Sequence, residues 1–244
     1  IEEINNMKQQ WNRSLAVVAV SCLAGLPLAA QELERPSVPR FDFFAGYAYF
    51  NSPKLSLPEH GFHLQGGVNV KRWLALGVDY SRAEGTFSLT PNLLTANLRG
   101  AAEEVLTQWK AGGYIPQNYS GAVPTSVTTQ TFAAGPQLVW RHRGWALTFG
   151  PSLGWVLEKA TTHPIDDVTT FFVSSISDNP TSTDHNFFYG GGAAVDINAT
   201  RHLGLRVRVD VVHDTLFTSS YLAEGRNTVR VSIGPSFHFG KSLR

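Results

Sequence analysis

The sequence predicts an all-β fold, an eight-stranded antiparallel up-and-down β-barrel, and three observations support this prediction. Eight segments alternate large apolar residues with small or polar ones, which is the two-residue period of a β-strand. The connections between these segments alternate between short and long. Beyond the N-terminal region, no segment shows a sustained 3.6-residue period, so helices are expected only within loops.

The N-terminal region has the three-part layout of a secretory signal peptide. A basic stretch, Met7–Arg13, precedes the apolar segment Leu15–Leu28, and small residues follow up to Ala30. The apolar segment is shorter than the roughly 20 residues that a spanning helix needs, which favours a cleavable signal helix over a membrane anchor. We therefore expect cleavage after Ala30, and we expect residues 1–6 to lie upstream of the natural start.

These features divide the chain into four parts. We expect an upstream extension and signal peptide at 1–30, a periplasmic leader at 31–40, the barrel at 41–240 and a short tail at 241–244. Cys22, the only cysteine, lies within the signal peptide. A lipoprotein signal built on Cys22 is an alternative to simple cleavage.

The predicted strands begin after the leader and continue to the tail. Their ranges are Phe41–Asn51, Gly61–Val70, Trp73–Arg82, Thr129–Trp140, Trp145–Leu157, Asn186–Ile197, His202–His213 and Thr228–Phe239. The second and third, fourth and fifth, and sixth and seventh strands are joined by tight turns. The other four connections are predicted to be long, and the one after the third strand contains Leu93–Lys110, which could carry a short helix. Short periplasmic turns and long external loops are typical of transmembrane barrels, and an even strand number returns both termini to the periplasmic side.

The fifth predicted strand indicates which face of the barrel is apolar. One face carries Trp145, Leu147, Phe149, Pro151, Leu153, Trp155 and Leu157. The other carries Ala146, Thr148, Gly150, Ser152, Gly154 and Val156. Because the interior of an eight-stranded barrel is only just wide enough for side chains, the large apolar residues are expected to point outward. An apolar exterior of this extent is tolerated only in lipid, so the predicted barrel is transmembrane.

Aromatic residues are expected to form two belts at the membrane surfaces. Trp145 and Trp155 are ten residues apart, which is about 33 Å along a strand. A strand tilted by about 40–45° would then cross an apolar band of roughly 24 Å, as in known outer-membrane barrels. The predicted girdle residues are Tyr49, Tyr80, Trp140, Trp145, Trp155, Phe187, Phe237 and Phe239. Trp73 has the opposite parity and is predicted to be a turn residue.

Charged residues occupy the inward-facing positions of several predicted strands. The clearest case is LRVRVDVV at 205–212, in which aliphatic and charged residues alternate. The predicted lumen charges are Asp42, Asp79, Asp196, Arg206, Arg208, Asp210 and Arg230. Unpaired charges are costly in a narrow, poorly hydrated interior. We therefore expect an ion-pair network that plugs the barrel more than it opens it.

Several segments carry a resemblance to a known family. They are FFAGYAYF, GGVNVKRWLALGVDYS, GPQLVW, YGGGAAVDINATRHLGLRVRVDVV and VRVSIGPSFHFG. On these patterns of aromatic residues, glycines and aspartates, most of residues 41–240 resembles the outer-membrane β-barrel domain family of small OmpA/OmpX-like, porin-family proteins. The resemblance implies a bacterial outer-membrane protein surrounded by outer-membrane lipid and inserted by the barrel-assembly machinery. It also implies a role as a scaffold, a narrow pore or a surface-interaction protein.

The outer rim is the candidate location for catalysis. Asp184 and His185 lie beside the predicted start of the sixth strand, and His213 and Asp214 lie at the end of the seventh. With the intervening turn centred near 199–200, antiparallel pairing places residue 185 opposite about 214. Two His–Asp pairs meeting there would suit a general base or a metal site. The alternative is a polar rim where the strands leave the lipid.

Composition excludes one class of partner and leaves the activity open. The 244 residues have a formal net charge of +1 and no basic block, so nothing indicates binding to nucleic acid. We expect a non-enzymatic outer-membrane protein with no catalytic residues, cofactor or metal. Its long outer loops are expected to make surface contacts with an extracellular partner that the sequence does not identify. The alternatives are a lipid-modifying or proteolytic barrel that uses the His/Asp rim and a soluble exported barrel that binds an apolar ligand.

Overall fold

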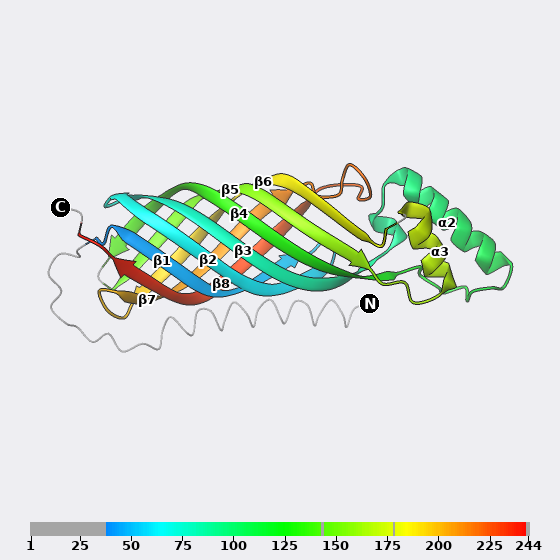
Figure 1. The fold of residues 1–244 in the computed structure, drawn as a ribbon, viewed down its shortest axis with the longest axis horizontal. Helices are drawn as coiled ribbons and strands as arrows, with labels where there is room; N and C mark the ends of the chain where they lie inside the picture. The colour runs from blue at the N-terminus through cyan, green and yellow to red at the C-terminus, as the bar shows by residue number, and fades with distance from the viewer. Residues whose placement is uncertain (1–37, 143, 178, 243–244) are drawn as a thin grey trace, which may run out of the picture. The chain divides into compact units, whose positions relative to one another are not determined.

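The computed structural model describes residues 38–142, 144–177 and 179–242. The unit Pro36–Arg244 contains a closed barrel of eight antiparallel strands, each paired with its neighbours in chain order (Figure 1). The strands are β1 Phe41–Ser52, β2 Leu57–Lys71, β3 Leu74–Leu89, β4 Val123–His142, β5 Trp145–Thr162, β6 Thr181–Asn198, β7 Leu203–Asp214 and β8 Arg226–Phe239. The predicted fold is therefore confirmed. The predicted signal peptide lies outside the described residues.

The barrel closes by pairing its first strand with its last. Phe41 of β1 lies opposite Phe239 of β8, so the barrel begins and ends at the same rim. The three tight turns also lie at this rim, and we call it the inner rim. Gly144, in the turn between β4 and β5, has a φ of 77°, a left-handed conformation that glycine adopts without a Cβ penalty. Trp73 lies in the turn between β2 and β3, which confirms the prediction for that residue.

At the opposite rim, which we call the outer rim, three of the four connections are long and one is short. Residues 90–122, 163–180 and 215–225 form the long ones. The connection between β1 and β2 is only residues 53–56, so the prediction of a long loop is wrong there. Leu55 and Leu57 are buried in the mouth of the barrel, and the amide of Leu55 donates to the carbonyl of Ser52. These contacts fold the segment into a tight hairpin.

Several strands continue further toward the outer rim than the sequence predicted. β4 begins at Val123 instead of Thr129, and β6 begins at Thr181 instead of Asn186. These extensions are rich in threonine and serine, so they lack the contrast between large apolar and small residues that marks the rest of each strand. Pairing with neighbouring strands holds them in the sheet regardless, for example Val123 opposite Leu89.

Helices occur only in the long connections of the described chain. η1 Pro91–Leu93 and α2 Ala96–Ala111 lie between β3 and β4, which confirms the predicted loop helix. α3 Asp167–Ile176, between β5 and β6, was not predicted. Its start is marked by a capping box in which the Asp166 side chain accepts from the amide of Thr169. None of these helices is long and apolar enough to cross a membrane.

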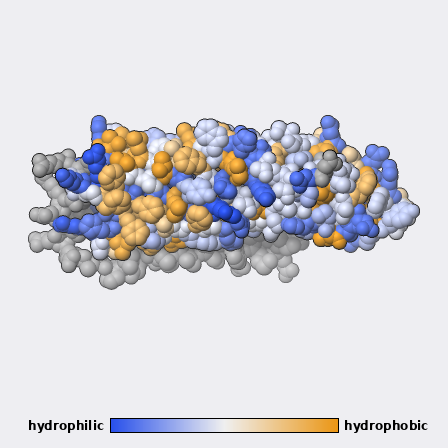
Figure 2. Space-filling model, in the orientation of Figure 1, coloured by the Kyte–Doolittle hydropathy of each residue, from blue (hydrophilic) through white to orange (hydrophobic). Residues whose placement is uncertain are grey.

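The two faces of the strands have the predicted orientation. Trp155 and Phe149 are exposed on the outside of the barrel at 62% and 48%, whereas Arg206 and Asp210 are buried inside it. Figure 2 shows apolar residues gathered over the half of the barrel nearer the inner rim, with more hydrophilic residues toward α2 and α3. An apolar band of this kind is stable only in lipid, so the barrel crosses a bilayer. A closed antiparallel barrel with an even strand number and such a band has the form of a bacterial outer-membrane protein.

Candidate functional site

The lumen nearer the inner rim is crossed by an ion-pair cluster centred on Arg206. The guanidinium of Arg206, from β7, donates at 2.9 Å to Asp196 of β6 and at 3.1 Å to Asp42 of β1. It also donates at 2.8 Å to the side-chain oxygen of Gln65 on β2. The guanidinium also lies over the Phe44 ring, with its Cζ atom 5.7 Å from the ring centre. One side chain therefore connects four strands across the barrel.

A second cluster, centred on Arg230, lies next along the lumen. Arg230, from β8, donates at 3.1 Å to Asp79 of β3 and at 2.9 Å to Asp210 of β7. Asp210 also accepts from Arg208 at 2.6 Å. His63 lies 3.5 Å from the Asp79 carboxylate and 3.0 Å from the hydroxyl of Ser232. The structure thus places all seven predicted lumen charges inside the barrel, each at most 9% exposed, in two clusters.

A third cluster, near the outer rim, was not predicted. Arg226 of β8 is paired with Glu158 of β5 and, at 3.2 Å, with Asp214 of β7. Thr129 donates to Glu158 at 3.2 Å. Glu59, on β2, is 1% exposed, and its Oε1 has no hydrogen-bond partner in the described part of the chain.

The charged members of the third cluster lie just outside the predicted strand limits. Glu158 follows a strand predicted to end at Leu157, and Arg226 precedes one predicted to begin at Thr228. Continuing the alternation by two residues at the outer end of each strand would have placed them in the lumen. The two-residue alternation was therefore sufficient to place them, but the predicted strands were too short.

Apolar side chains seal the lumen beyond the third cluster. Leu57 of β2, Val127 of β4, and Leu216, Phe217 and Leu222 of the connection between β7 and β8 pack into one buried cluster. Phe217 has a φ of 58°, which is uncommon for a residue with a side chain and costs of order 1 kcal/mol. Its amide donates at 2.5 Å to the Asp184 carboxylate, which holds it in this conformation.

The predicted pairing of the two His–Asp pairs at the outer rim is wrong. The turn between β6 and β7 is centred beyond residue 200, so His213 lies opposite Tyr189, and His185 lies past the end of this strand pair. The His213 ring instead contacts Asn227 at 2.9 Å. Asp214 points into the lumen toward Arg226. The described residues contain no group of three or more histidine, cysteine, aspartate or glutamate side chains arranged to hold a metal ion.

The eight predicted girdle residues all lie on outward-facing positions of the barrel. Trp140 and Trp145 lie together at the inner rim, with ring centres 6.2 Å apart. Further along the barrel, Trp155 and Phe187 make an edge-to-face contact at 5.6 Å. Tyr49 and Tyr80 are only partly exposed, because His60 and Phe62 pack against their rings. Contact of these rings with the membrane surfaces stays a prediction.

The long connections are tied to one another above the outer rim. Leu94 pairs with Leu222, and the amide of Thr95 donates to the carbonyl of Tyr221 at 2.9 Å. The hydroxyl of Tyr119 donates at 2.5 Å to Asp166, the residue that caps α3. This hydrogen bond lowers the pKa of Asp166, whereas desolvation and the same bond raise the pKa of Tyr119 to about 12.

The comparisons with known proteins find similar structures but no sequence relatives. No protein-family model matches the chain, and no curated protein matches it. Ail, the attachment invasion locus protein of Yersinia pestis, is similar with a TM-score of 0.47 and 12% identity, over 83% of this chain and 99% of Ail. Neisserial surface protein A has the same TM-score and identity, over 82% and 96%. A major outer membrane protein of Thermus thermophilus has a TM-score of 0.40 and 13% identity, over 81% and 99%. At these identities the likeness concerns the fold and says nothing of activity.

Replacing Arg230 with methionine should strongly destabilise the barrel. The change leaves Asp79 buried without its arginine and Asp210 with only Arg208. Breaking a buried ion pair from one side costs about 3–5 kcal/mol. We expect a loss of that size in the free energy of unfolding, measured by urea titration in lipid. Arg82→Met, which removes an exposed pair with Glu84, should cause little change. Equal effects of the two variants would contradict the proposed burial of the network.

The Tyr119–Asp166 hydrogen bond should stabilise the loops only between two pH limits. Because the pKa of Asp166 is lowered, its contribution is present above the ordinary aspartate pKa and is lost as the pH falls through the lowered value. Because the pKa of Tyr119 is raised to about 12, its contribution is present below about pH 10 and is lost as the pH rises through 12. We expect the protection of the α3 amides, measured relative to the exchange rate of an unfolded chain at the same pH, to decrease at both limits.

Tyrosine absorbance provides the matched measurement. A phenol that titrates near pH 12 should be present in the wild type and in Tyr114→Phe, because that variant keeps Tyr119 and its hydrogen bond to Asp166. The same phenol should be missing in Tyr119→Phe. Identical titration curves for the two variants would show that Tyr119 is not in this hydrogen bond.

Proposed function

We propose that this chain is a non-enzymatic outer-membrane barrel that acts through surface contacts of its outer loops and whose lumen does not conduct. The observation that carries this proposal is the filled lumen. Three ion-pair clusters cross it, centred on Arg206, Arg230 and Arg226. Above them lies a buried apolar cluster. Because the three ion-pair clusters and the apolar cluster fill the lumen, they support a structural role for the barrel. They also favour contact with other molecules on the outside of the barrel over contact within the lumen.

The folded loops support surface contact as the role. Tyr114, Ile165 and Phe171 are 81%, 69% and 47% exposed, although they are large apolar residues outside the membrane band. Trp109 holds two of them together, because its ring stacks on Phe171 at 6.1 Å and lies 6.3 Å from Tyr114. Exposed apolar patches on folded surfaces commonly mark interaction sites, and aromatic residues dominate the binding energy of such sites. We call Trp109, Tyr114 and Phe171 the aromatic patch.

The surroundings of the barrel follow from its exterior. Outer-membrane lipid covers the apolar band, and the barrel-assembly machinery inserts the chain into the membrane.

The catalytic alternative loses its main support, because it required the two His–Asp pairs at the outer rim to meet and the observed register separates them. Of the extracellular partner we propose only one property. Its contact surface must accommodate aromatic side chains.

Planar-bilayer recording tests whether the lumen conducts. We expect no stable conductance steps from the wild type. Arg206→Ala should also remain silent, because the Arg230 and Arg226 clusters and the apolar cluster above them stay in place. Heat-modifiable migration on a denaturing gel confirms that each sample is folded. Stable unitary steps from the folded wild type would refute the proposal of a closed barrel.

Binding of protein-bearing liposomes to a panel of bacterial and animal cell surfaces tests the aromatic patch. Replacing Tyr114 and Phe171 with serine should weaken binding at least tenfold, because aromatic anchors typically contribute about 2 kcal/mol or more. The matched control replaces Gln117 and Thr170, exposed neighbours of the patch on the same loops, with serine. Absence of binding by the wild type, or equal loss in the control, would contradict a surface-contact role through this patch.

A further inference from the structure

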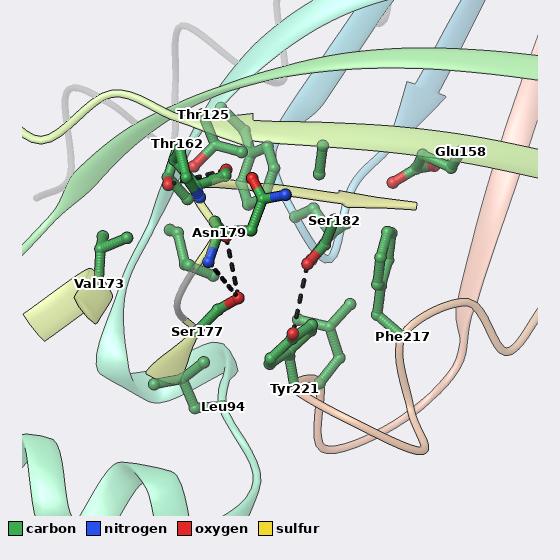
Figure 3. A pocket seen from close by; sticks show the side chains of 16 residues that line it. Leu94, Thr125, Glu158, Thr162, Val173, Ser177, Asn179, Ser182, Phe217 and Tyr221 are labelled. Atoms are coloured by element: carbon green, nitrogen blue, oxygen red, sulfur yellow. Dashed lines mark hydrogen bonds between the residues drawn. The ribbon is translucent and has the colours of Figure 1, made fainter. Parts of the chain in front are cut away.

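A cavity of about 80 Å³ lies above the outer rim of the barrel, between the loops and the ends of the strands. Leu94, Val173, Phe217 and Tyr221 surround it (Figure 3). Its floor includes Glu158 of the third ion-pair cluster. The three long connections and the hairpin between β1 and β2 all contribute to its wall, so a molecule held there would lie between the outer segments of the barrel.

Each polar side chain that lines the cavity makes at least one hydrogen bond or ion pair within the protein. The Glu158 carboxylate is held by Arg226 and Thr129. Ser182 donates to the hydroxyl of Tyr221 at 3.3 Å, as Figure 3 shows.

The other polar members of the wall are bonded in the same way. The hydroxyls of Thr125, Thr162 and Ser177 each donate to a backbone carbonyl, and the side-chain oxygen of Asn179 accepts from the amide of Thr181. Because these polar groups already have partners, the wall offers a ligand chiefly apolar contacts. A polar group placed in the cavity would lose its hydrogen bonds to water and gain few in return.

Size and access restrict the ligand further. An apolar cavity of roughly 150 Å³ holds one benzene ring, so this smaller cavity is suited to a narrower body. Asn179 and Pro180 are exposed, whereas Leu94 and Val173 are buried, so the cavity has one edge near solvent and one deep end. This arrangement suits a molecule with an apolar tip and a polar head.

We propose that this cavity binds the end of a short alkyl chain, with the chain tip against Leu94 and Val173 and the polar head at the edge formed by Asn179 and Pro180. The site is separate from the aromatic patch, so it does not depend on the surface-contact role. Binding would fill the space shared by the three long connections and hold them in one arrangement.

Methyl NMR of the full chain in lipid nanodiscs tests this proposal, with 1-butanol and 1,4-butanediol as probes. The two probes have the same carbon chain, but the diol carries a second hydroxyl into the deep end. We expect saturable shifts of the methyl groups of Leu55, Leu94, Val173 and Leu222 with 1-butanol. The diol should bind at least tenfold more weakly. Shifts that increase linearly with 1-butanol, or equal binding of the two probes, would overturn the proposal.

A pair of matched variants tests the location of the site. Ala160 lines the cavity, and Ala160→Leu should fill it and abolish the saturable shifts. Ala101→Leu makes the same change on the exposed face of α2 and should leave binding as in the wild type. Heat-modifiable migration shows whether each variant folds. If Ala160→Leu does not fold, the comparison of the two probes on the wild type decides the proposal by itself. Unchanged binding in a folded Ala160→Leu variant would overturn it.

Discussion

The narrow interior of an eight-stranded barrel is the constraint on which the rest of this structure depends. Such an interior holds side chains and little else, so every inward residue must be small, closely packed or paired. Three inward arginines, Arg206, Arg226 and Arg230, meet this requirement because each lies between two carboxylates from other strands. The same pairs join strands that are not neighbours in the sheet, for example β8 with β3. Large apolar side chains are left for the outside, where only lipid can cover them.

The character of the lumen changes along the barrel. Ion-pair clusters fill it from the inner rim to the level of Arg226, and aliphatic and aromatic residues fill it beyond. The change occurs where the strands extend past the apolar band and the outer loops return into the mouth. Leu216, Phe217 and Leu222 come from a loop but belong to the lumen core. The loops are thus part of the folded body, and they present the aromatic patch and enclose the cavity from a fixed position.

Two-residue alternation was sufficient to predict the eight strands, the orientation of their faces and the burial of the seven charges. It worked because the contrast between bulky apolar and small or charged residues is strong wherever a strand separates lipid from a crowded lumen. The signal weakens beyond the lipid, and this is why Glu158 and Arg226 were missed and why the predicted starts of β4 and β6 were too late. α3 was missed because its ten residues are too few to establish a helical period, although Asp166 and Thr169 carried a capping signal.

The sequence by itself determined the fold and the sidedness of the barrel, because both follow from a local pattern that repeats along each strand. Only the tertiary structure decided which charges pair, because the partners come from strands far apart in sequence, as Arg226 and Glu158 do. It also decided the register of β6 and β7, since a turn centred slightly later separates His185 from His213 and removes the predicted rim site. The cavity and the aromatic patch likewise exist only after three loops have folded onto the barrel, and no local pattern encodes where separate loops meet.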